Sequence, residues 1–188
     1  MGQQGNNVGV SGARVEVELL GPVRVLLDAE QATPAGEPQR VLLAELALAR
    51  GRAVSTAEPI EALWPDEPPG NALGNLQSHL SRLRRLLGTD RITKEAAGYR
   101  LNIAEDEVDI GRVERLAEQA RSCPDPEQAA RLLGQAVGAW RGEPLADLTD
   151  RLPLESERAR LTEWRRQLRH ERCWGCCRTW SKPQGPTR

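Results

Sequence analysis

Apolar and polar residues alternate near the start of this chain and recur at helical spacing over most of the rest. The alternation follows two short segments whose apolar sets are Val15, Val17 and Leu19, then Val23, Val25 and Leu27. Period-two alternation is typical of strands with one buried face. It predicts a small antiparallel sheet over residues 14–34. The polar, glycine- and asparagine-rich residues 1–13 are expected to form a disordered tail.

Three helices are predicted after the sheet, over residues 37–50, 55–64 and 72–87. Ser55 and Glu58 fit a capping box at the start of the second helix. In the third helix, Asn71 is the expected N-cap and Gly88 the expected stop. The leucines on one side of this helix are Leu73, Leu76, Leu80, Leu83 and Leu87. The opposite side carries small polar and cationic residues, namely Asn71, Gly74, Asn75, Ser78, Ser81, Arg82 and Arg85.

A β-hairpin is predicted next, with strands at 91–93 and 99–101 joined by a turn over 94–98. A sheet, three helices and a hairpin follow one another in the order of a winged helix-turn-helix with an added N-terminal sheet. We therefore expect a winged-helix domain over residues 14–104.

Amphipathic helices are predicted beyond this point at residues 109–121, 125–140 and 154–172. The short breaks between them are typical of stacked helical hairpins, so residues 105–172 are interpreted as a helical domain. Residues 173–188 show no usable periodicity and are expected to be an irregular tail. The predicted fold class is mainly α with small β-sheets.

The formal net charge of −1 conceals charged blocks. Residues 71–100 carry six basic and two acidic side chains, and the segments on both sides of them are acidic. The helix at 72–87 contains no acid at all. A solvated surface usually mixes Glu with Lys at helical spacing, whereas a localised basic block suits a phosphate backbone. A solvated face remains the alternative for the arginines alone.

The sequence gives little support for a membrane protein, a secreted protein, an enzyme or a zinc protein. There is no apolar run long enough to span a membrane and no signal-peptide pattern, so a cytoplasmic, nucleoid-associated protein without membrane contact is expected. No phosphate-loop, GxSxG or HExxH motif is present, which argues against an enzyme and against a cofactor. The spacing from His170 to Cys177 is H-x2-C-x2-C-C, but it lacks a second paired half, and reduced thiols are favoured over zinc.

The chain resembles the Streptomyces antibiotic regulatory protein family. The matching stretches are LLGPVRV, QRVLLAELAL, VSTAEPIEALWPDEPPGNALGNLQSHLSRLRRLLG, GYRL, VDIGRVERL and AVGAWRGEPLADL. They cover about residues 15 to 165. The resemblance implies an OmpR-like winged helix-turn-helix, followed by a partial bacterial transcriptional activation domain of tetratricopeptide-like helices.

The same resemblance implies an activator of a biosynthetic gene cluster. Such a protein would bind direct repeats in double-stranded DNA near promoters, as a homodimer or tandem oligomer, and would recruit RNA polymerase. Ser78 and Arg82 match base-reading positions in the major groove. The positions that match backbone or groove-edge contacts are Asn75, His79, Ser81, Arg84 and Arg85. For His79, a metal-ligand or base role is the alternative, but no partner cluster surrounds it.

In the wing, Tyr99 of GYR matches a phosphate-contacting tyrosine. Lys94 stands in for an arginine that related wings carry at the tip, while Glu95 would oppose phosphate. Two other interpretations remain open. The helical half can be a protein-interaction module beside a degenerate winged helix, or the chain can act as a dominant-negative fragment that binds DNA without activating transcription.

Overall fold

The computed structural model describes residues 14–148 and 152–180, with residues 152, 153 and 174–180 as backbone only. The expected N-terminal tail and the last eight residues lie outside this description. The chain divides into two compact units. One comprises Arg24–Ile103 with the segment that ends at Val17, and the other comprises Glu18–Val23 and the chain from Ala104 onward.

The first unit begins with a three-stranded sheet in the order β1-β2-β3. The strands are β1 (Val15–Glu18), β2 (Arg24–Leu27) and β3 (Glu30–Ala32). β2 and β3 are antiparallel, with Val25 opposite Ala32. The third strand escaped prediction because Glu30 and Gln31 are exposed and carry no apolar alternation.

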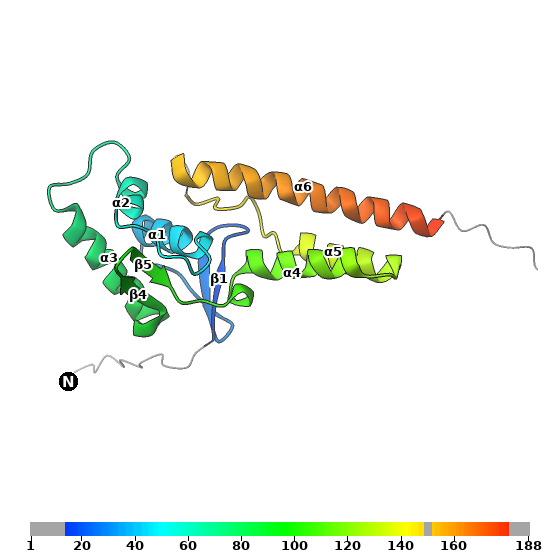
Figure 1. Cartoon of the computed structure of the whole chain (residues 1–188), viewed down its shortest axis with the longest axis horizontal. Coiled ribbons are helices and arrows are strands. Elements are labelled where there is room, and N and C mark those ends of the chain that lie inside the picture. Colours follow the sequence, from blue (N-terminus) through cyan, green and yellow to red (C-terminus); the bar gives the residue numbers. More distant parts are fainter. Residues whose placement is uncertain (1–13, 149–151, 181–188) are drawn as a thin grey trace, which may run out of the picture. The chain divides into compact units, whose positions relative to one another are not determined.

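Three helices and a hairpin complete this unit (Figure 1). The helices are α1 (Glu37–Leu48), α2 (Ala57–Leu63) and α3 (Ala72–Leu87), and α1 packs against both of the others. The hairpin consists of β4 (Ile92–Glu95) and β5 (Gly98–Leu101). Only half of the predicted capping box forms, since Glu58 accepts from the Ser55 backbone N–H at 3.0 Å but no side chain caps α2.

The second unit is built from α4 (Asp109–Ser122), α5 (Pro126–Gly138) and α6 (Leu152–Trp180). α5 packs against both α4 and α6. The prediction that α6 ends at residue 172 is wrong, because the helix continues to Trp180. Backbone hydrogen bonds propagate a helix without an apolar stripe, and no proline lies between Pro153, in the first turn, and Pro183.

Residues 18–23, which comprise the last residue of β1 and the connection to β2, belong to the helical unit. One carboxylate oxygen of the buried Asp109 accepts from the backbone N–H groups of Leu19 and Leu20, both at 2.8 Å. The Arg141 N–H donates to the Leu20 carbonyl at 2.8 Å, and the Leu145 N–H donates to the Leu19 carbonyl at 3.0 Å. The LLGPVRV and AWRGEPLADL stretches are therefore hydrogen-bonded to each other.

Both units have apolar cores, and the mainly α fold with small β-sheets confirms the predicted fold class. The largest fully buried side chains are almost all leucines, drawn from α1, α3, the β4–β5 hairpin and the loops of the helical unit.

Candidate nucleic-acid interface

Helix α3 is fixed at both ends and along one side. The Asn71 side chain accepts from the Gly74 N–H at 3.1 Å, which confirms the predicted N-cap. Gly88 ends the helix with φ of 107°, a value that favours glycine. Four leucines at helical spacing are at most 1% exposed: Leu76, Leu80, Leu83 and Leu87. This buried stripe determines which face of α3 points to solvent.

Leu73 does not belong to that buried stripe, contrary to its predicted place in it. Its side chain is 48% exposed, whereas Leu76, the next leucine along the stripe, is fully buried. Helical spacing predicts the direction in which a side chain points. It does not predict how far along α3 the helices that pack against it, α1 and α2, extend. Leu73 lies in the first turn, at the edge of the face that the other helices cover.

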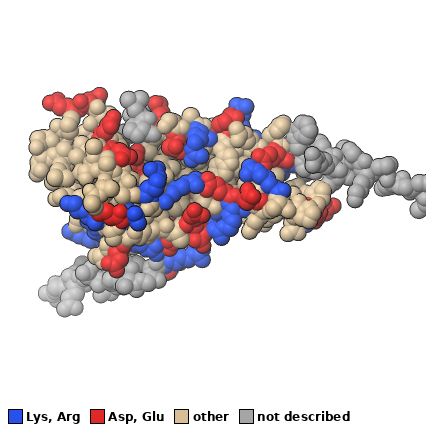
Figure 2. Space-filling view, in the orientation of Figure 1, with Lys and Arg blue, Asp and Glu red and all other residues tan. Residues whose placement is uncertain are grey.

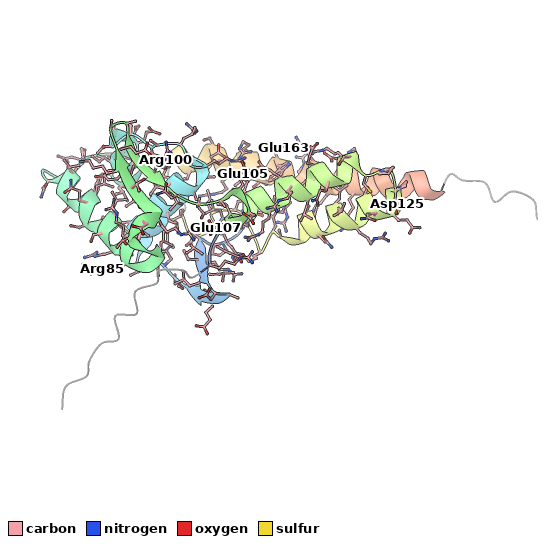
Figure 3. The ribbon with its side chains drawn as sticks, turned by 60° about the horizontal axis from the view of Figure 1, so that its bottom comes forward. Arg85, Arg100, Glu105, Glu107, Asp125 and Glu163 are labelled. Atoms are coloured by element: carbon pink, nitrogen blue, oxygen red, sulfur yellow. The ribbon has the colours of Figure 1, made fainter. Side chains whose placement is uncertain are left out.

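The face opposite the buried leucines gathers most of the predicted DNA-contacting residues. Asn75, Ser78, Arg82 and Arg85 are exposed there, at intervals of three and four residues along α3. Figure 3 shows the Arg85 side chain extending outward from the helix. Ser81 is half-buried on the same side. Helical geometry thus places two guanidinium groups and two small polar side chains on one surface.

Gln77 is also exposed on α3, although it is not among the residues predicted to contact DNA. It lies on the flank of the helix, between the buried stripe and the exposed face. Its amide can both donate and accept hydrogen bonds, as can the edge of an adenine base. The signal that could have found it is the absence of any acidic residue on this helix.

The Ser78 hydroxyl donates to the carbonyl of Gly74, one turn earlier, at 3.0 Å. Its single proton is then used within the helix, so the oxygen faces solvent as an acceptor. The short side chain also lets an approaching partner come close to the helix axis.

His79 is half-buried beside this face. Burial and the neighbouring Arg82 charge both lower the pKa of its imidazole, burial being the larger cause. Its Nδ1 is enclosed and has no hydrogen-bond partner. The neutral ring is therefore favoured at neutral pH in the absence of an anion.

The hairpin is attached to α3 through Arg84. Its Nε–H donates to the carbonyl of Ile92 at 2.8 Å. Arg84 is half-buried, unlike Arg82 and Arg85, and part of its guanidinium is committed inside the protein. Arg84, which is predicted to contact the DNA backbone or the groove edge, therefore also stabilises the protein itself.

The turn of the hairpin is shorter than predicted. Glu95 pairs with Gly98, so Ala96 and Ala97 alone form the turn and Lys94 lies within β4. Lys94 is exposed. Glu95 forms an ion pair with Arg100 at 2.9 Å, which offsets the acidic charge that the sequence placed near the wing tip. Figure 3 shows where Arg100 lies on the hairpin.

The prediction that the Tyr99 side chain touches phosphate is contradicted, since the residue is only 2% exposed. Tyr99 lies on the same face of the hairpin as the buried Ile92 and Leu101. Its partner Lys94, on the same face near the end of the hairpin, is exposed. Its backbone exchanges two 2.8 Å hydrogen bonds with Val54. Tyr99 thus anchors the hairpin to the chain between α1 and α2.

On the face drawn in Figure 2, basic and acidic side chains are interspersed, without a large area of one sign.

Within the described residues, no group of three or more His, Cys, Asp and Glu side chains is placed to hold a metal ion. Cys173 is exposed, and the side chains of Cys176 and Cys177 lie outside the description. No described helix is both long enough and apolar enough to cross a membrane.

Residues 108–175 match the family model of the bacterial transcriptional activator domain. The chain is 40% identical to the regulatory protein AfsR of Streptomyces coelicolor over 154 residues, which cover 80% of this chain and 15% of AfsR. It is 30% identical to the regulatory protein DnrI of Streptomyces peucetius over 165 residues, which cover 80% of this chain and 61% of DnrI. The chain is thus similar, over most of its length, to regulators of the Streptomyces antibiotic regulatory protein family.

A solved structure of this family agrees with the fold. Mycobacterium tuberculosis EmbR, in complex with a low-affinity phosphopeptide, superposes with a TM-score of 0.79 at 32% sequence identity. The match covers 84% of this chain and 44% of the EmbR chain. The chain thus spans less than two thirds of the length of each of these three proteins. AfsR and DnrI are named regulatory proteins, and EmbR of Mycobacterium tuberculosis is named a transcriptional regulatory protein.

Proposed function

We propose that this protein belongs to the Streptomyces antibiotic regulatory protein family and is a sequence-specific DNA-binding transcriptional regulator. Its α3 would enter the major groove of double-stranded DNA. The observation that carries this proposal is the division of α3 into a fully buried leucine side and an exposed, acid-free side with Ser78, Arg82 and Arg85.

The chemistry of this exposed side suits DNA. An α-helix fits the width of the major groove, and a guanidinium can bridge the two acceptors of guanine. Arg82 is exposed in the middle of this side of α3, so we assign it to a base edge. Ser78 presents an acceptor, which suits the amino group of adenine or cytosine.

Affinity would come from contacts with phosphate. Asn75, Arg85 and Lys94 are exposed polar or cationic side chains on α3 and β4. His79 and Ser81 lie at the edges of the same side of α3. Phosphate contacts fix the register on the duplex and release counterions, while base contacts select the sequence.

In keeping with its family, the protein would activate a biosynthetic gene cluster by binding direct repeats near promoters and recruiting RNA polymerase. Two or more copies would occupy adjacent repeats. The names of AfsR and DnrI as regulatory proteins support this part of the proposal, and the match to the activator domain supports an activating role.

The test is selection from a pool of random duplexes, followed by fluorescence anisotropy of the selected duplex and a scrambled control at two salt concentrations. A repeated motif bound at least about a hundredfold more tightly than the control supports the proposal. Equal binding to both duplexes would refute it. Transcription with purified polymerase on the selected site then separates an activator from a fragment that binds DNA without activating.

A further inference from the structure

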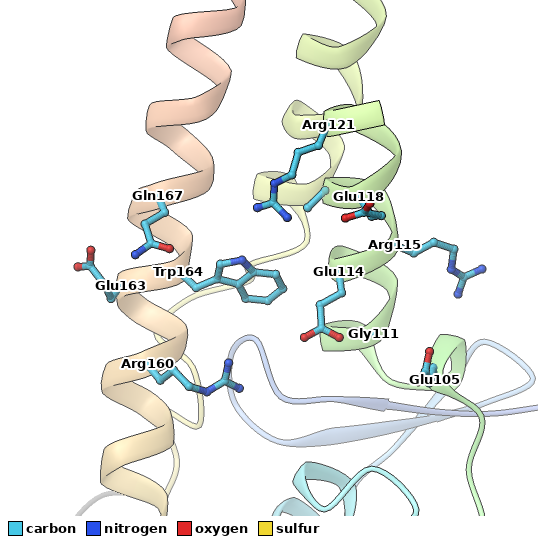
Figure 4. Close-up of a pocket in the computed structure, with 11 residues that line it drawn as sticks. Glu105, Gly111, Glu114, Arg115, Glu118, Arg121, Arg160, Glu163, Trp164 and Gln167 are labelled. Carbon is cyan, nitrogen blue, oxygen red and sulfur yellow. The ribbon is translucent and has the colours of Figure 1, made fainter. Parts of the chain in front are cut away.

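A groove of about 750 Å³ runs between α4 and α6 in the helical unit. α5 packs against both helices, and the groove lies between their remaining flanks. Its walls include Gly111 to Arg121 on α4 and Arg160 to Gln167 on α6 (Figure 4). Ten residues of helix rise by about 15 Å, which is the length of four or five residues of extended peptide.

Trp164 gives the groove an apolar wall. Its half-buried ring extends from α6 toward α4 (Figure 4). Behind it lies the buried ring of Trp140, at 5.5 Å between ring centroids and 67° between planes. This contact holds the Trp164 ring in place while part of it lines the groove.

The two arginines that line the groove near its ends are already paired with carboxylates. Arg121 donates to both carboxylate oxygens of Glu171, at 3.1 and 3.3 Å. This bond raises the pKa of the Arg121 guanidinium further above its usual range. The Nε of Arg160 donates to Glu157 at 2.8 Å. Neither guanidinium is available as a strong site for an anionic ligand.

Carboxylates outnumber guanidiniums around the groove. The charged residues that line it are four glutamates and three arginines: Glu105, Glu114, Glu118 and Glu163, with Arg115, Arg121 and Arg160. Two of these arginines are also paired with carboxylates outside the lining, Arg121 with Glu171 and Arg160 with Glu157. Figure 4 shows Arg115 directed away from the space between the helices. An aromatic wall beside an excess of carboxylates attracts a cation and repels phosphate.

We propose that this groove binds a basic, extended segment of a partner protein. A lysine or arginine of that segment would lie against the Trp164 ring, with its charge near Glu118. The occupant is a peptide rather than a small amine because the groove has the length of several residues. The inference goes beyond DNA reading and does not depend on it, because all of the groove residues belong to the helical unit.

The test uses the full chain and a fluorescein-labelled peptide of about eight alternating leucine and arginine residues, followed by anisotropy. A peptide with glutamate in place of arginine is the ligand control. Glu118→Gln removes one exposed groove carboxylate without touching the core. The matched variant is Glu127→Gln, on α5 outside the groove, where Glu127 lies 3.7 Å from Arg131.

We expect the arginine peptide to bind, the glutamate peptide not to bind, and Glu118→Gln to raise Kd about fivefold while Glu127→Gln leaves it unchanged. Trp164→Leu should raise Kd at least as much, with helix content checked by circular dichroism. Equal binding of both peptides, or equal loss in the two glutamine variants, overturns the proposal. A stable dimer that the arginine peptide fails to dissociate also overturns it, since a second copy would then fill the groove. DNA binding is measured separately, so its failure leaves this result intact.

Discussion

The Nε–H of Arg84 donates to the carbonyl of Ile92 at 2.8 Å, and this bond joins α3 to the β4–β5 hairpin. On either side of it along the sequence, Arg82 and Arg85 are exposed. These three arginines therefore differ in their surroundings. Substitution should change sequence preference at Arg82, the salt dependence of affinity at Arg85 and protein stability at Arg84.

Removing Arg82 should lower sequence preference more than affinity for random DNA. Arg82→Ala is expected to lose about 1–3 kcal/mol on the selected duplex, because one bidentate base contact is lost. Binding to a scrambled duplex should change by much less. Anisotropy on both duplexes measures the two effects, and an equal loss on both would remove Arg82 from the base-reading set.

Removing Arg85 should weaken binding to all duplexes alike. An exposed arginine that contacts phosphate contributes counterion release, so Arg85→Ala should reduce the slope of log K against log salt by about one. The measurement is anisotropy over a salt series. An unchanged slope would show that Arg85 contacts no phosphate.

Removing Arg84 should cost stability as well as affinity. Arg84→Ala breaks the bond to Ile92 and leaves a partly buried carbonyl without this donor, at an expected cost of about 1–2 kcal/mol in the free energy of unfolding. Arg82→Ala is the matched control and should unfold at the same denaturant concentration as the wild type. Equal stability of all three proteins would show that the Arg84 bond contributes nothing.

Gly98 should tolerate no side chain. Its φ is 144°, and an added Cβ would lie 1.9 Å from the carbonyl oxygen of Val54. Gly98→Ala is therefore expected to destabilise the winged unit by roughly 2–4 kcal/mol through strain and loss of the Val54–Tyr99 pairing. Gly70→Ala, where a Cβ meets nothing within 4 Å, is the control, measured by the same denaturant titration. A Gly98→Ala protein as stable as the control would contradict the hairpin geometry.

DNA binding should strengthen as pH falls. Burial and Arg82 lower the pKa of His79, so the ring is neutral in the free protein, whereas nearby phosphate would favour the protonated form. Binding then takes up a proton, and affinity should rise from about pH 7.5 to about pH 5.5, around the usual imidazole pKa of ~6.5. A His79→Asn variant should lose that part of the pH dependence. If the variant keeps the full dependence, His79 does not face phosphate.

Asp109 should make the helical unit less stable as pH rises. Burial raises the pKa of this carboxyl to about 6, above its unfolded value of 3.8, despite the hydrogen bonds from Leu19 and Leu20. The folded state therefore binds more protons between about pH 4 and about pH 6, and stability falls across that window as pH increases. Denaturant unfolding followed by tryptophan fluorescence measures the slope. Asp109→Asn should flatten it, and an unchanged slope would assign the effect to another group.

The sequence predicted the local features of the interface well. The N-cap Asn71, the stop at Gly88 and the direction of the exposed face follow from residue types and helical spacing, and the structure confirms them. The exposed positions of Ser78 and Arg82 follow from the same spacing. Their contacts with DNA stay predictions.

Features that depend on distant parts of the chain were not predictable. The face on which Tyr99 lies depends on a two-residue turn at Ala96 and Ala97, and that turn lacks the glycine or asparagine that usually marks one. The attachment of residues 18–23 to Asp109 spans about ninety positions of sequence and has no local pattern. Leu73 is exposed for a similar reason, because periodicity carries no information on where a neighbouring element ends.

The most direct test of the central claim is methylation interference on the selected duplex with wild-type and Arg82→Ala protein. Methylation of guanine N7 blocks the major-groove edge that an arginine bridges. We predict that N7 methylation of a guanine in each repeat prevents wild-type binding, and that one such position no longer matters for Arg82→Ala. Interference confined to the minor-groove edge of adenines, or an identical pattern for the two proteins, would contradict the account of α3 as the reading helix.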